Sequence, residues 1–382
     1  MTEINRILRQ KTQLLCKGLF LDEDLRDYYK SQGIELNFGR KGGAGPLGGR
    51  YFLIGDEHTL ANIALWDNPA KTSLVLKEKK EDNKFEVYNT KEKALFGELI
   101  LVENPKYYSP EYKTSDGIEM KRIALVHGVD CLATTIYQKC HYWACGEACK
   151  FCGIELSLKY GTTILEKSAE QLNEVIKVAK EEGRCSHVTL TSGTTAEENK
   201  GTMRYINLIK GVRAEYPNLP LHIQIEPLED LNFLERLKEA GADTIGIHIE
   251  VIDQLMRNVI TPGKAKIPYE VFEKNWKYAL EVFGENQVES FLLTGFGESR
   301  YDFLEDAEKM ISLGVIPFIT PVRPIPGRKS DMPIMNHNAL LEIYIKSAEM
   351  MVQYGVNPLK NKAGCVRCGG CSAINEAYRS VK

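Results

Sequence analysis

The chain has 382 residues, 43% of them hydrophobic, and a formal net charge of −3 at pH 7. This length suits one large domain with appendages or two to three smaller domains, and the apolar fraction excludes broad disorder. The nearly balanced charge predicts no binding to nucleic acid or to an anionic membrane.

The first 18 residues are charged throughout and lack the apolar stretch of a signal peptide, and the longest apolar runs are far too short to span a bilayer. We therefore expect a soluble, cytoplasmic protein. Ten cysteines in such a chain are not expected to form a disulfide framework, because the cytosol keeps thiols reduced. Five lie within residues 131–152 and three within 365–371, and this clustering favours metal binding.

Residues 1–120 contain short extended runs such as "RYFLI", "LANIALW" and "GELILVE", separated by charged or turn-forming residues. They predict a small, mostly β accessory region. The glycine-rich segment 39–50 could bring backbone amides close to an anion or serve as a flexible connector. The connector is favoured, because the segment has neither phosphate-loop nor dinucleotide-binding spacing.

A strand at 132–138 begins the next region, and from Ser168 helical and extended signals alternate. Ser168 and Gln171 form a capping box at the start of a helix that Gly183 ends. Further helices are expected near 201–214, 230–240, 268–283 and 300–313, and further strands at 187–193, 221–226, 244–250, 288–295 and 316–321.

Such alternation predicts parallel strands joined by right-handed crossovers. Six units predict an α/β fold with a partial (β/α)6 TIM-like barrel, open on one side; an open doubly wound sheet is the alternative. In either fold the site lies at the C-terminal ends of the strands. We assign residues 121–330 to this core and 331–382 to a C-terminal helix with a cysteine motif.

Cys145, Cys149 and Cys152 follow the first predicted strand with the spacing C-x3-C-x2-C. Three thiolates in a short loop can bind three irons of a 4Fe–4S cluster and leave the fourth iron open to a substrate or cofactor. Zinc is the alternative, although structural zinc takes four ligands in paired spacings. Cys140 could complete such a set of four.

Near the C-terminus, "AGCVRCGGCSA" has the spacing C-x2-C-x2-C. The glycines let the backbone fold around a cluster, so this motif predicts a second iron–sulfur cluster whose fourth ligand is distant or absent. A zinc knuckle is the alternative. The triplet is Cys365, Cys368 and Cys371, and the candidate fourth ligands are Cys16, Cys131 and Cys140.

The first triplet, with aromatic Phe151 before its last cysteine and a βα repeat behind it, resembles the radical S-adenosylmethionine (SAM) superfamily with a biotin- or lipoyl-synthase-like core. The resemblance implies that Cys145, Cys149 and Cys152 bind a 4Fe–4S cluster whose open iron binds SAM. Reductive cleavage of SAM then gives a 5′-deoxyadenosyl radical that abstracts hydrogen from a substrate. It also implies anaerobic operation and an electron donor such as flavodoxin or ferredoxin.

The same resemblance implies a set of cofactor-binding residues. The stretch "FLLTGFGES" matches the strand that packs on adenine, and "TLTSGTT" takes the second-strand position where members often carry Gly-Gly-Glu, here without the glutamate. The stretch 245–264 matches the end of the fourth strand. The implied cofactor-binding residues are Ser192, Gly193, Thr194, Glu250, Arg257, Gly295, Gly297 and Glu298.

Two further residues are candidates for substrate binding. His248 alternates with isoleucines on the fourth strand and faces the barrel or the core. Arg323, after the last strand, faces the barrel mouth by alternation, where it binds a substrate carboxylate or phosphate or braces a proline-rich loop.

Over nearly the whole chain, stretches such as "HGVDCLATT", "FCGIELSL" and "AGCVRCGGCSA" resemble a radical SAM family often encoded beside nitrilases. No settled reaction of that family can be transferred. We therefore predict an enzyme, in the transferase class, that abstracts hydrogen from a small molecule and then inserts sulfur or functionalises the C–H bond in another way. The alternatives are a non-catalytic iron–sulfur carrier or electron-transfer protein and a zinc-stabilised barrel.

Overall fold

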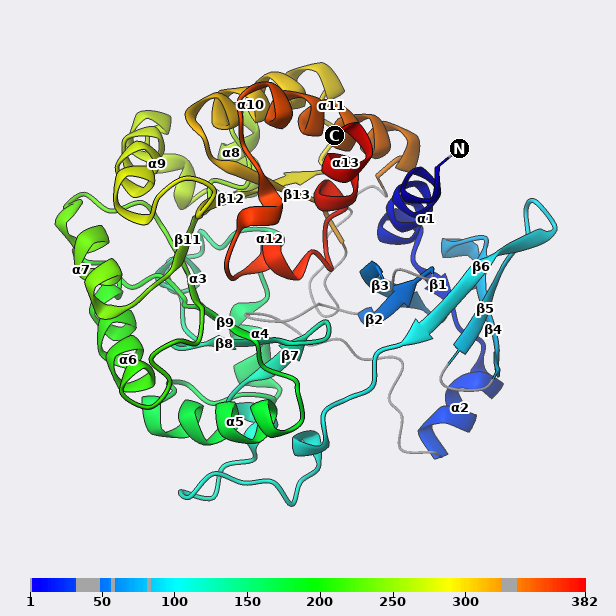
Figure 1. Cartoon of the computed structure of the whole chain (residues 1–382), viewed down its shortest axis with the longest axis horizontal. Helices are drawn as coiled ribbons and strands as arrows, with labels where there is room; N and C mark the ends of the chain where they lie inside the picture. The colour runs from blue at the N-terminus through cyan, green and yellow to red at the C-terminus, as the bar shows by residue number, and fades with distance from the viewer. Residues whose placement is uncertain (1, 32–48, 56–58, 81–83, 324–334) are drawn as a thin grey trace.

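The computed structural model describes residues 2–31, 49–55, 59–80, 84–323 and 335–382. Figure 1 shows two β structures side by side: an arc of strands surrounded by helices, and a smaller β unit near the N-terminus. Most of the glycine-rich segment considered above, residues 39–48, lies outside the described residues. No helix in the described ranges has both the length and the hydropathy needed to cross a membrane.

The larger sheet has seven strands in the spatial order β13-β12-β11-β10-β9-β8-β7. Strands β8 to β13 are all parallel, whereas β7 pairs antiparallel with β8. The strands are β7 (Leu125–His127), β8 (Cys131–Thr135), β9 (His187–Thr191), β10 (Leu221–Ile225), β11 (Thr244–Ile247), β12 (Val288–Thr294) and β13 (Ile316–Pro321).

Six parallel strands in sequential order confirm the partial (β/α)6 barrel. A doubly wound sheet would reverse its strand order at a switch point, and this sheet has no reversal. The crossover helices, together with α11 after the last strand, form an arc outside the strands (Figure 1). They are α5 (Ala169–Glu181), α6 (Thr202–Glu215), α7 (Asn232–Ala240), α8 (Gln254–Ile260), α9 (Tyr269–Phe283), α10 (Arg300–Leu313) and α11 (His337–Gln353).

Helix α5 shows why these segments fold as they do. The capping box is present: the Gln171 N–H donates to Ser168 Oγ at 3.2 Å, and the Ser168 N–H donates to Gln171 Oε1 at 3.0 Å. Its apolar stripe, including Leu172, Val175 and Ile176, is fully buried against the sheet. The amphipathic pattern therefore sets which face of the helix covers the half-barrel.

Six short strands near the N-terminus form a closed barrel in the order β1-β3-β2-β6-β5-β4, with its own core around Phe52, Ile63 and Phe85. Helices α1 (Glu3–Lys17) and α2 (Glu23–Ser31) accompany it. The strands are β1 (Leu19–Phe20), β2 (Gly49–Ile54), β3 (Thr59–Trp66), β4 (Leu74–Lys80), β5 (Lys84–Asn89) and β6 (Ala94–Leu101).

The chain ends with the short helix α12 (Cys365–Cys368) and helix α13 (Ile374–Val381). Helix α12 and the residue before it lie across the N-terminal ends of the half-barrel strands. The Gly364 N–H donates to Nδ1 of His187, where β9 begins, and the Val366 N–H donates to Oε2 of Glu289 near the start of β12. The start of the C-terminal cysteine motif therefore lies at the opposite end of the half-barrel from the first cysteine triplet, whereas its last cysteine, Cys371, reaches the cavity that Cys149 and Cys152 line.

Candidate functional site

A cavity of about 360 Å³ lies where the parallel strands of the half-barrel end. Its walls come from the segments that follow β9, β10 and β11, from β12 and the end of β13, and from the cysteine loop after β8. One wall residue, Asn62, belongs to β3 of the N-terminal barrel. The position at the C-terminal strand ends is the one predicted for the site.

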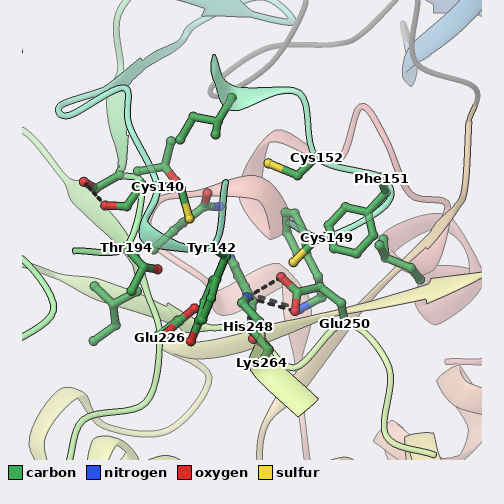
Figure 2. A pocket seen from close by; sticks show the side chains of 18 of the residues that line it. Cys140, Tyr142, Cys149, Phe151, Cys152, Thr194, Glu226, His248, Glu250 and Lys264 are labelled. Carbon is green, nitrogen blue, oxygen red and sulfur yellow. Dashed lines mark hydrogen bonds and ion pairs between the residues drawn. The ribbon is translucent and has the colours of Figure 1, made fainter. Parts of the chain in front are cut away.

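The cysteine loop contributes Cys149 and Cys152 to the cavity wall, and Cys140 lies there as well (Figure 2). Cys145 is exposed, and its thiol lies 3.7 Å from the carbonyl oxygen of Tyr142. Across the described ranges, no three His, Cys, Asp or Glu side chains converge closely enough to hold one metal ion. The predicted ligands share a loop, but their three sulfurs are not gathered at one point.

Contacts with two neighbouring segments hold this loop. The His141 N–H donates to the carbonyl of Thr194 after β9 at 2.7 Å, and the Lys150 N–H donates to the carbonyl of Ile260 in α8 at 2.9 Å. Gly263 packs so closely on the Tyr142 ring that a Cβ there would lie 2.2 Å from a ring carbon. The loop is therefore fixed at both ends.

Its tip is less constrained. Gly146 has φ +77° and no atom within 4 Å of where a Cβ would lie. At this tip the Cys145 thiol contacts the carbonyl of Tyr142 and the carboxylate of Glu147 and does not line the cavity.

Burial raises the pKa of the Cys149 thiol well above its usual range, although Lys264 opposes the rise. Burial and the nearby Cys152 raise the pKa of Cys140 to about 11. Without a metal these thiols are protonated at neutral pH, so metal binding would release protons.

Glu250 and Lys264 form a buried ion pair on the cavity wall beside Cys149 (Figure 2). Nζ of Lys264 lies 2.7 and 2.9 Å from the two carboxylate oxygens and 3.2 Å from the carbonyl of His248. Glu250 adopts φ +61° while its backbone still pairs with β12, which is an unusual conformation for a residue with a Cβ.

The charges of this pair follow from its surroundings. Burial raises the pKa of Glu250 despite the opposing charge of Lys264. Burial lowers the pKa of Lys264, but Glu250, Cys149 and Glu226 together raise it by more. Lys264 is therefore a fixed positive charge between two carboxylates and a thiol.

Glu226 is a site residue that the sequence analysis did not identify. It follows β10, is 5% exposed, and accepts from the Tyr142 hydroxyl at 3.1 Å and from Lys200 Nζ at 3.4 Å (Figure 2). Its other oxygen, Oε1, is buried with no hydrogen-bond partner among the residues that the structure describes. The signal was present, because "LHIQIE" ends its strand on a glutamate just as "IGIHIE" ends on Glu250.

Ser192, Gly193 and Thr194 line the cavity as a turn after β9. A Cβ on Gly193 would lie 1.9 Å from the carbonyl oxygen of Lys139, so only glycine fits there. The turn therefore presses against the start of the cysteine loop.

His248 also lines the cavity, stacked on Phe291 with ring centroids 4.1 Å apart. Its Nδ1 accepts from the Phe291 N–H at 3.2 Å, and burial lowers the pKa of the imidazole well below its usual range. The ring is therefore neutral and carries its proton on Nε2.

Arg257 does not line either of the two cavities described here. It is fully buried, and its guanidinium donates to the carbonyls of Lys264 at 2.8 Å and Ile267 at 2.7 Å. In this structure it braces the turn that carries Lys264. Its predicted contact with the cofactor carboxylate stays a prediction.

The Glu298 carboxylate closes the turn after β12 by accepting from the Gly295 N–H at 2.7 Å and the Phe296 N–H at 2.8 Å. Gly297 and Glu298 line a second cavity of about 650 Å³, which shares Glu250 with the first. The residues predicted to pack on adenine therefore lie next to the first cavity rather than on its wall.

Arg323 lines the first cavity together with Cys371 of the C-terminal triplet, and its predicted role in substrate binding stays a prediction. The thiols of Cys368 and Cys131, at the start of β8, are close enough that their interaction raises the pKa of Cys131 and lowers that of Cys368, and Gln224 Nε2 lies 3.3 Å from Cys365 Sγ. Of the three candidate fourth ligands, Cys131 therefore lies within the triplet's own contacts. Cys140 lies in the other cysteine loop.

Residues 141–310 match the family model of the Radical SAM superfamily. A search of curated proteins finds no relative of this chain. Among solved structures, methylornithine synthase is similar at 18% identity with a TM-score of 0.47, covering 65% of this chain and 70% of that one.

Two further structures are similar. The FeFe-hydrogenase maturase HydG from Carboxydothermus hydrogenoformans shows 19% identity and a TM-score of 0.47, over 61% of this chain and 53% of that one. Coproporphyrinogen III oxidase from Escherichia coli shows 16% identity and a TM-score of 0.41, over 62% of this chain and 54% of that one. The chain thus spans only about half the length of these two proteins.

Proposed function

We propose that this chain, whose residues 141–310 match the radical SAM family model, binds a 4Fe–4S cluster through Cys145, Cys149 and Cys152 and abstracts hydrogen from a small molecule. One observation carries the proposal: Cys149 and Cys152 share the wall of one cavity with two buried carboxylates, Glu226 and Glu250. Thiolates beside groups suited to an amine and to hydroxyls match what a cluster and SAM require.

The donor set fits the cluster. Three thiols lie within eight residues, two of them on the cavity wall and the third, Cys145, exposed at the tip of the same loop. The positive charge of Lys264 near Cys149 favours the thiolate that iron binds. When bound, the cluster and SAM supply the electron and the 5′-deoxyadenosyl radical.

The protein's own residues bind and orient the cofactor. Oε1 of Glu226, buried and unpartnered among the described residues, is suited to accept from the ammonium group of SAM. This would supply the carboxylate that the turn of Ser192, Gly193 and Thr194 lacks. Glu250 remains an acceptor for ribose hydroxyls, since each of its oxygens uses only one lone pair on Lys264.

The contacts of the C-terminal cysteines support a second iron–sulfur cluster, with Cys131 as the fourth ligand beside Cys365, Cys368 and Cys371. All four thiols lie close enough to the buried Tyr51 hydroxyl to raise its pKa. Cys371 also lines the first cavity, so a cluster there would border the substrate. That position favours a role at the substrate, such as sulfur donation, over a remote electron relay.

The first test is SAM cleavage. The protein would be purified and reconstituted with iron and sulfide under anaerobic conditions, reduced with dithionite and incubated with SAM. We expect 5′-deoxyadenosine from the wild type and from a Cys185→Ala control, a buried cysteine outside both motifs, but none from Cys149→Ala. A wild type that binds iron but yields no 5′-deoxyadenosine would favour the iron–sulfur carrier.

Iron and sulfide counts test the second cluster. About eight irons per chain in the wild type, falling to about four in the Cys365/Cys368/Cys371→Ala triple variant, are expected for two cubane clusters. Cys131→Ala should lower the count as the triple variant does, whereas Cys16→Ala should not. Zinc in place of iron at either triplet would support the zinc-stabilised barrel.

A further inference from the structure

The N-terminal barrel contributes directly to the cavity. Asn62 lies on β3, is fully buried, and lines the cavity together with Arg323, Thr320 and Cys371. This β unit is therefore part of the wall of the candidate active site.

Asn62 is held rigidly at this position. Its N–H donates to the carbonyl of Gly370 at 2.7 Å, joining β3 to the C-terminal cysteine motif. The guanidinium of Arg323 donates to Asn62 Oδ1 and to the Asn62 carbonyl, both at 2.6 Å. Gly49 on the paired strand packs against the same amide, since a Cβ there would lie 2.7 Å from Asn62 Oδ1. The amide group can therefore neither rotate nor withdraw.

These contacts leave hydrogen-bond donors unused. Asn62 Nδ2 and Arg323 Nε are both buried and have no hydrogen-bond partner within the described ranges, and neither does Thr320 Oγ1. Buried donors without a partner are costly, so such a pair on a cavity wall indicates a ligand with acceptor atoms. Asn62 Oδ1 and the Asn62 carbonyl accept from Arg323, and the groups of this pair that have no partner in the described ranges, Asn62 Nδ2 and Arg323 Nε, are both donors.

The charges distinguish the two sides of the cavity. Glu226 and Glu250 are each paired with a lysine on their part of the wall, whereas Arg323 brings its positive charge to the neutral amide of Asn62, where the unused donors lie. One guanidinium balances the single charge of a carboxylate but not the charge of about −1.5 to −2 on a phosphate monoester at neutral pH.

We propose that Asn62 and Arg323 bind the carboxylate of the substrate, so that the hydrogen-abstracting enzyme proposed above acts on a small carboxylic acid. The inference rests on the proposed function only in calling the ligand a substrate. Binding itself requires neither SAM nor turnover. The carboxylate lies beside Cys371, and the rest of the molecule occupies the cavity toward Glu250 and Lys264.

The test uses the full chain, as purified and after cluster reconstitution, with sodium propionate as the probe and propionamide and inorganic phosphate for comparison. Saturation-transfer NMR measures binding without turnover. We expect propionate to bind more tightly than propionamide, and phosphate to bind more weakly than propionate. A wild type that binds phosphate but not propionate, or neither, would overturn the carboxylate assignment.

Two variants locate the site. Asn62→Asp keeps the acceptor for Arg323 but replaces the donor with a negative charge, and Arg323→Lys keeps the charge but loses Nε. Each should weaken propionate binding by about tenfold or more, whereas Arg300→Lys, in an exposed pair with Glu342, should not change it. If one variant does not fold, as judged by circular dichroism, the other variant alone tests whether these residues bind propionate.

Unchanged propionate binding in the folded variants would show that these residues are not the site. A protein that forms 5′-deoxyadenosine but does not bind propionate would keep the proposed function and lose this inference. A protein that binds propionate through Asn62 and Arg323 but never cleaves SAM would keep this inference and lose the proposed function.

Discussion

The two carboxylate oxygens of Glu226 have different surroundings in the cavity wall. One of its oxygens is bonded to Tyr142 and Lys200, and the other is buried without a partner among the described residues. A carboxylate oxygen in this state is a strong acceptor for a cationic ligand group, because little water competes for it.

We predict that Glu226→Gln weakens SAM binding by about ten- to a hundredfold, because a charge-assisted hydrogen bond is replaced by a neutral one. Equilibrium binding to the reconstituted protein measures this effect. The matched control is Glu229→Gln, an exposed glutamate three residues further along the chain. Equal affinities for all three proteins would remove Glu226 from the proposed cofactor site.

The buried pair of Glu250 and Lys264 makes a prediction about stability. Lys264→Met leaves the Glu250 carboxylate buried and unpaired, which is expected to cost about 3–5 kcal/mol of unfolding free energy. Urea unfolding of the full chain measures the loss. Adding Glu250→Gln should restore part of it, because the unpaired charge is then gone.

The unfolding free energy of Lys264→Met should also depend on pH. Burial raises the pKa of Glu250 and Lys264 lowers it, so removing Lys264 raises that pKa further. A carboxyl group whose pKa is raised in the folded state binds its proton more readily there than in the unfolded chain. The stability deficit of Lys264→Met should therefore shrink as the pH falls toward the carboxyl range. A deficit that grows on acidification would contradict this assignment.

At the scale of elements, the segment 254–267 shows how a helix and a turn position a charge. Arg257 in α8 donates to two backbone carbonyls of the following turn, and that turn carries Lys264 to Glu250. The arginine stacks on the Phe272 ring, with its guanidinium carbon 5.2 Å from the ring centroid. This geometry gives Arg257 a bracing role.

We predict that Arg257→Ala lowers the unfolding free energy by about 2–4 kcal/mol, because two buried carbonyls lose their donor. In Arg257→Lys, the ammonium can reach one carbonyl and should recover part of the loss. SAM affinity, measured on the same samples, separates the two roles of this residue. If Arg257→Lys is as stable as the wild type but binds SAM much more weakly, the residue acts on the cofactor.

Most of the longer helices and strands of the half-barrel were predictable from the sequence. The strands and the long helices of the half-barrel carry β-branched runs, an amphipathic period and capping residues, and the helix predicted at 300–313 matches α10. Helix α1, although 15 residues long, was not predicted, because residues 1–120 were expected to be mostly β. The short elements β7, α3 (His141–Ala144) and α4 (Ile154–Lys159) were not predicted, because three to six residues leave no period to detect. The placement of Arg257 also escaped prediction, since its partners are backbone carbonyls with no signature in the sequence.

At the scale of the whole molecule, distant parts of the chain meet around the cavity. Asn62 and Arg323 are 261 positions apart, and Lys11 of α1 pairs with Glu376 of α13 across almost the full length of the chain. No local pattern encodes such contacts, so the sequence predicted a small accessory region near the N-terminus but not its contact with the cavity. The cysteine triplets, in contrast, could be identified because their spacing is local.

The Lys11–Glu376 pair links the folding of the two chain ends to the second cysteine motif. Nζ of Lys11 lies 2.9 Å from the Glu376 carboxylate and 2.9 Å from the carbonyl of Gly369, which lies between Cys368 and Cys371. Both side chains are buried, so removing one partner leaves an uncompensated charge.

We predict that Lys11→Met lowers the unfolding free energy by about 3–5 kcal/mol and loosens the segment that holds Cys368 and Cys371. After anaerobic reconstitution the variant should lose iron from the C-terminal motif while keeping it at the first triplet, so 5′-deoxyadenosine should still form. The matched control is Arg6→Met, which breaks the exposed pair with Glu3 on the same helix and should cost at most about 1 kcal/mol. If Lys11→Met loses both clusters equally, the ion pair supports the whole fold rather than the C-terminal motif. Selective loss of the second cluster would show that α1 holds that motif in place across the junction of the two β structures.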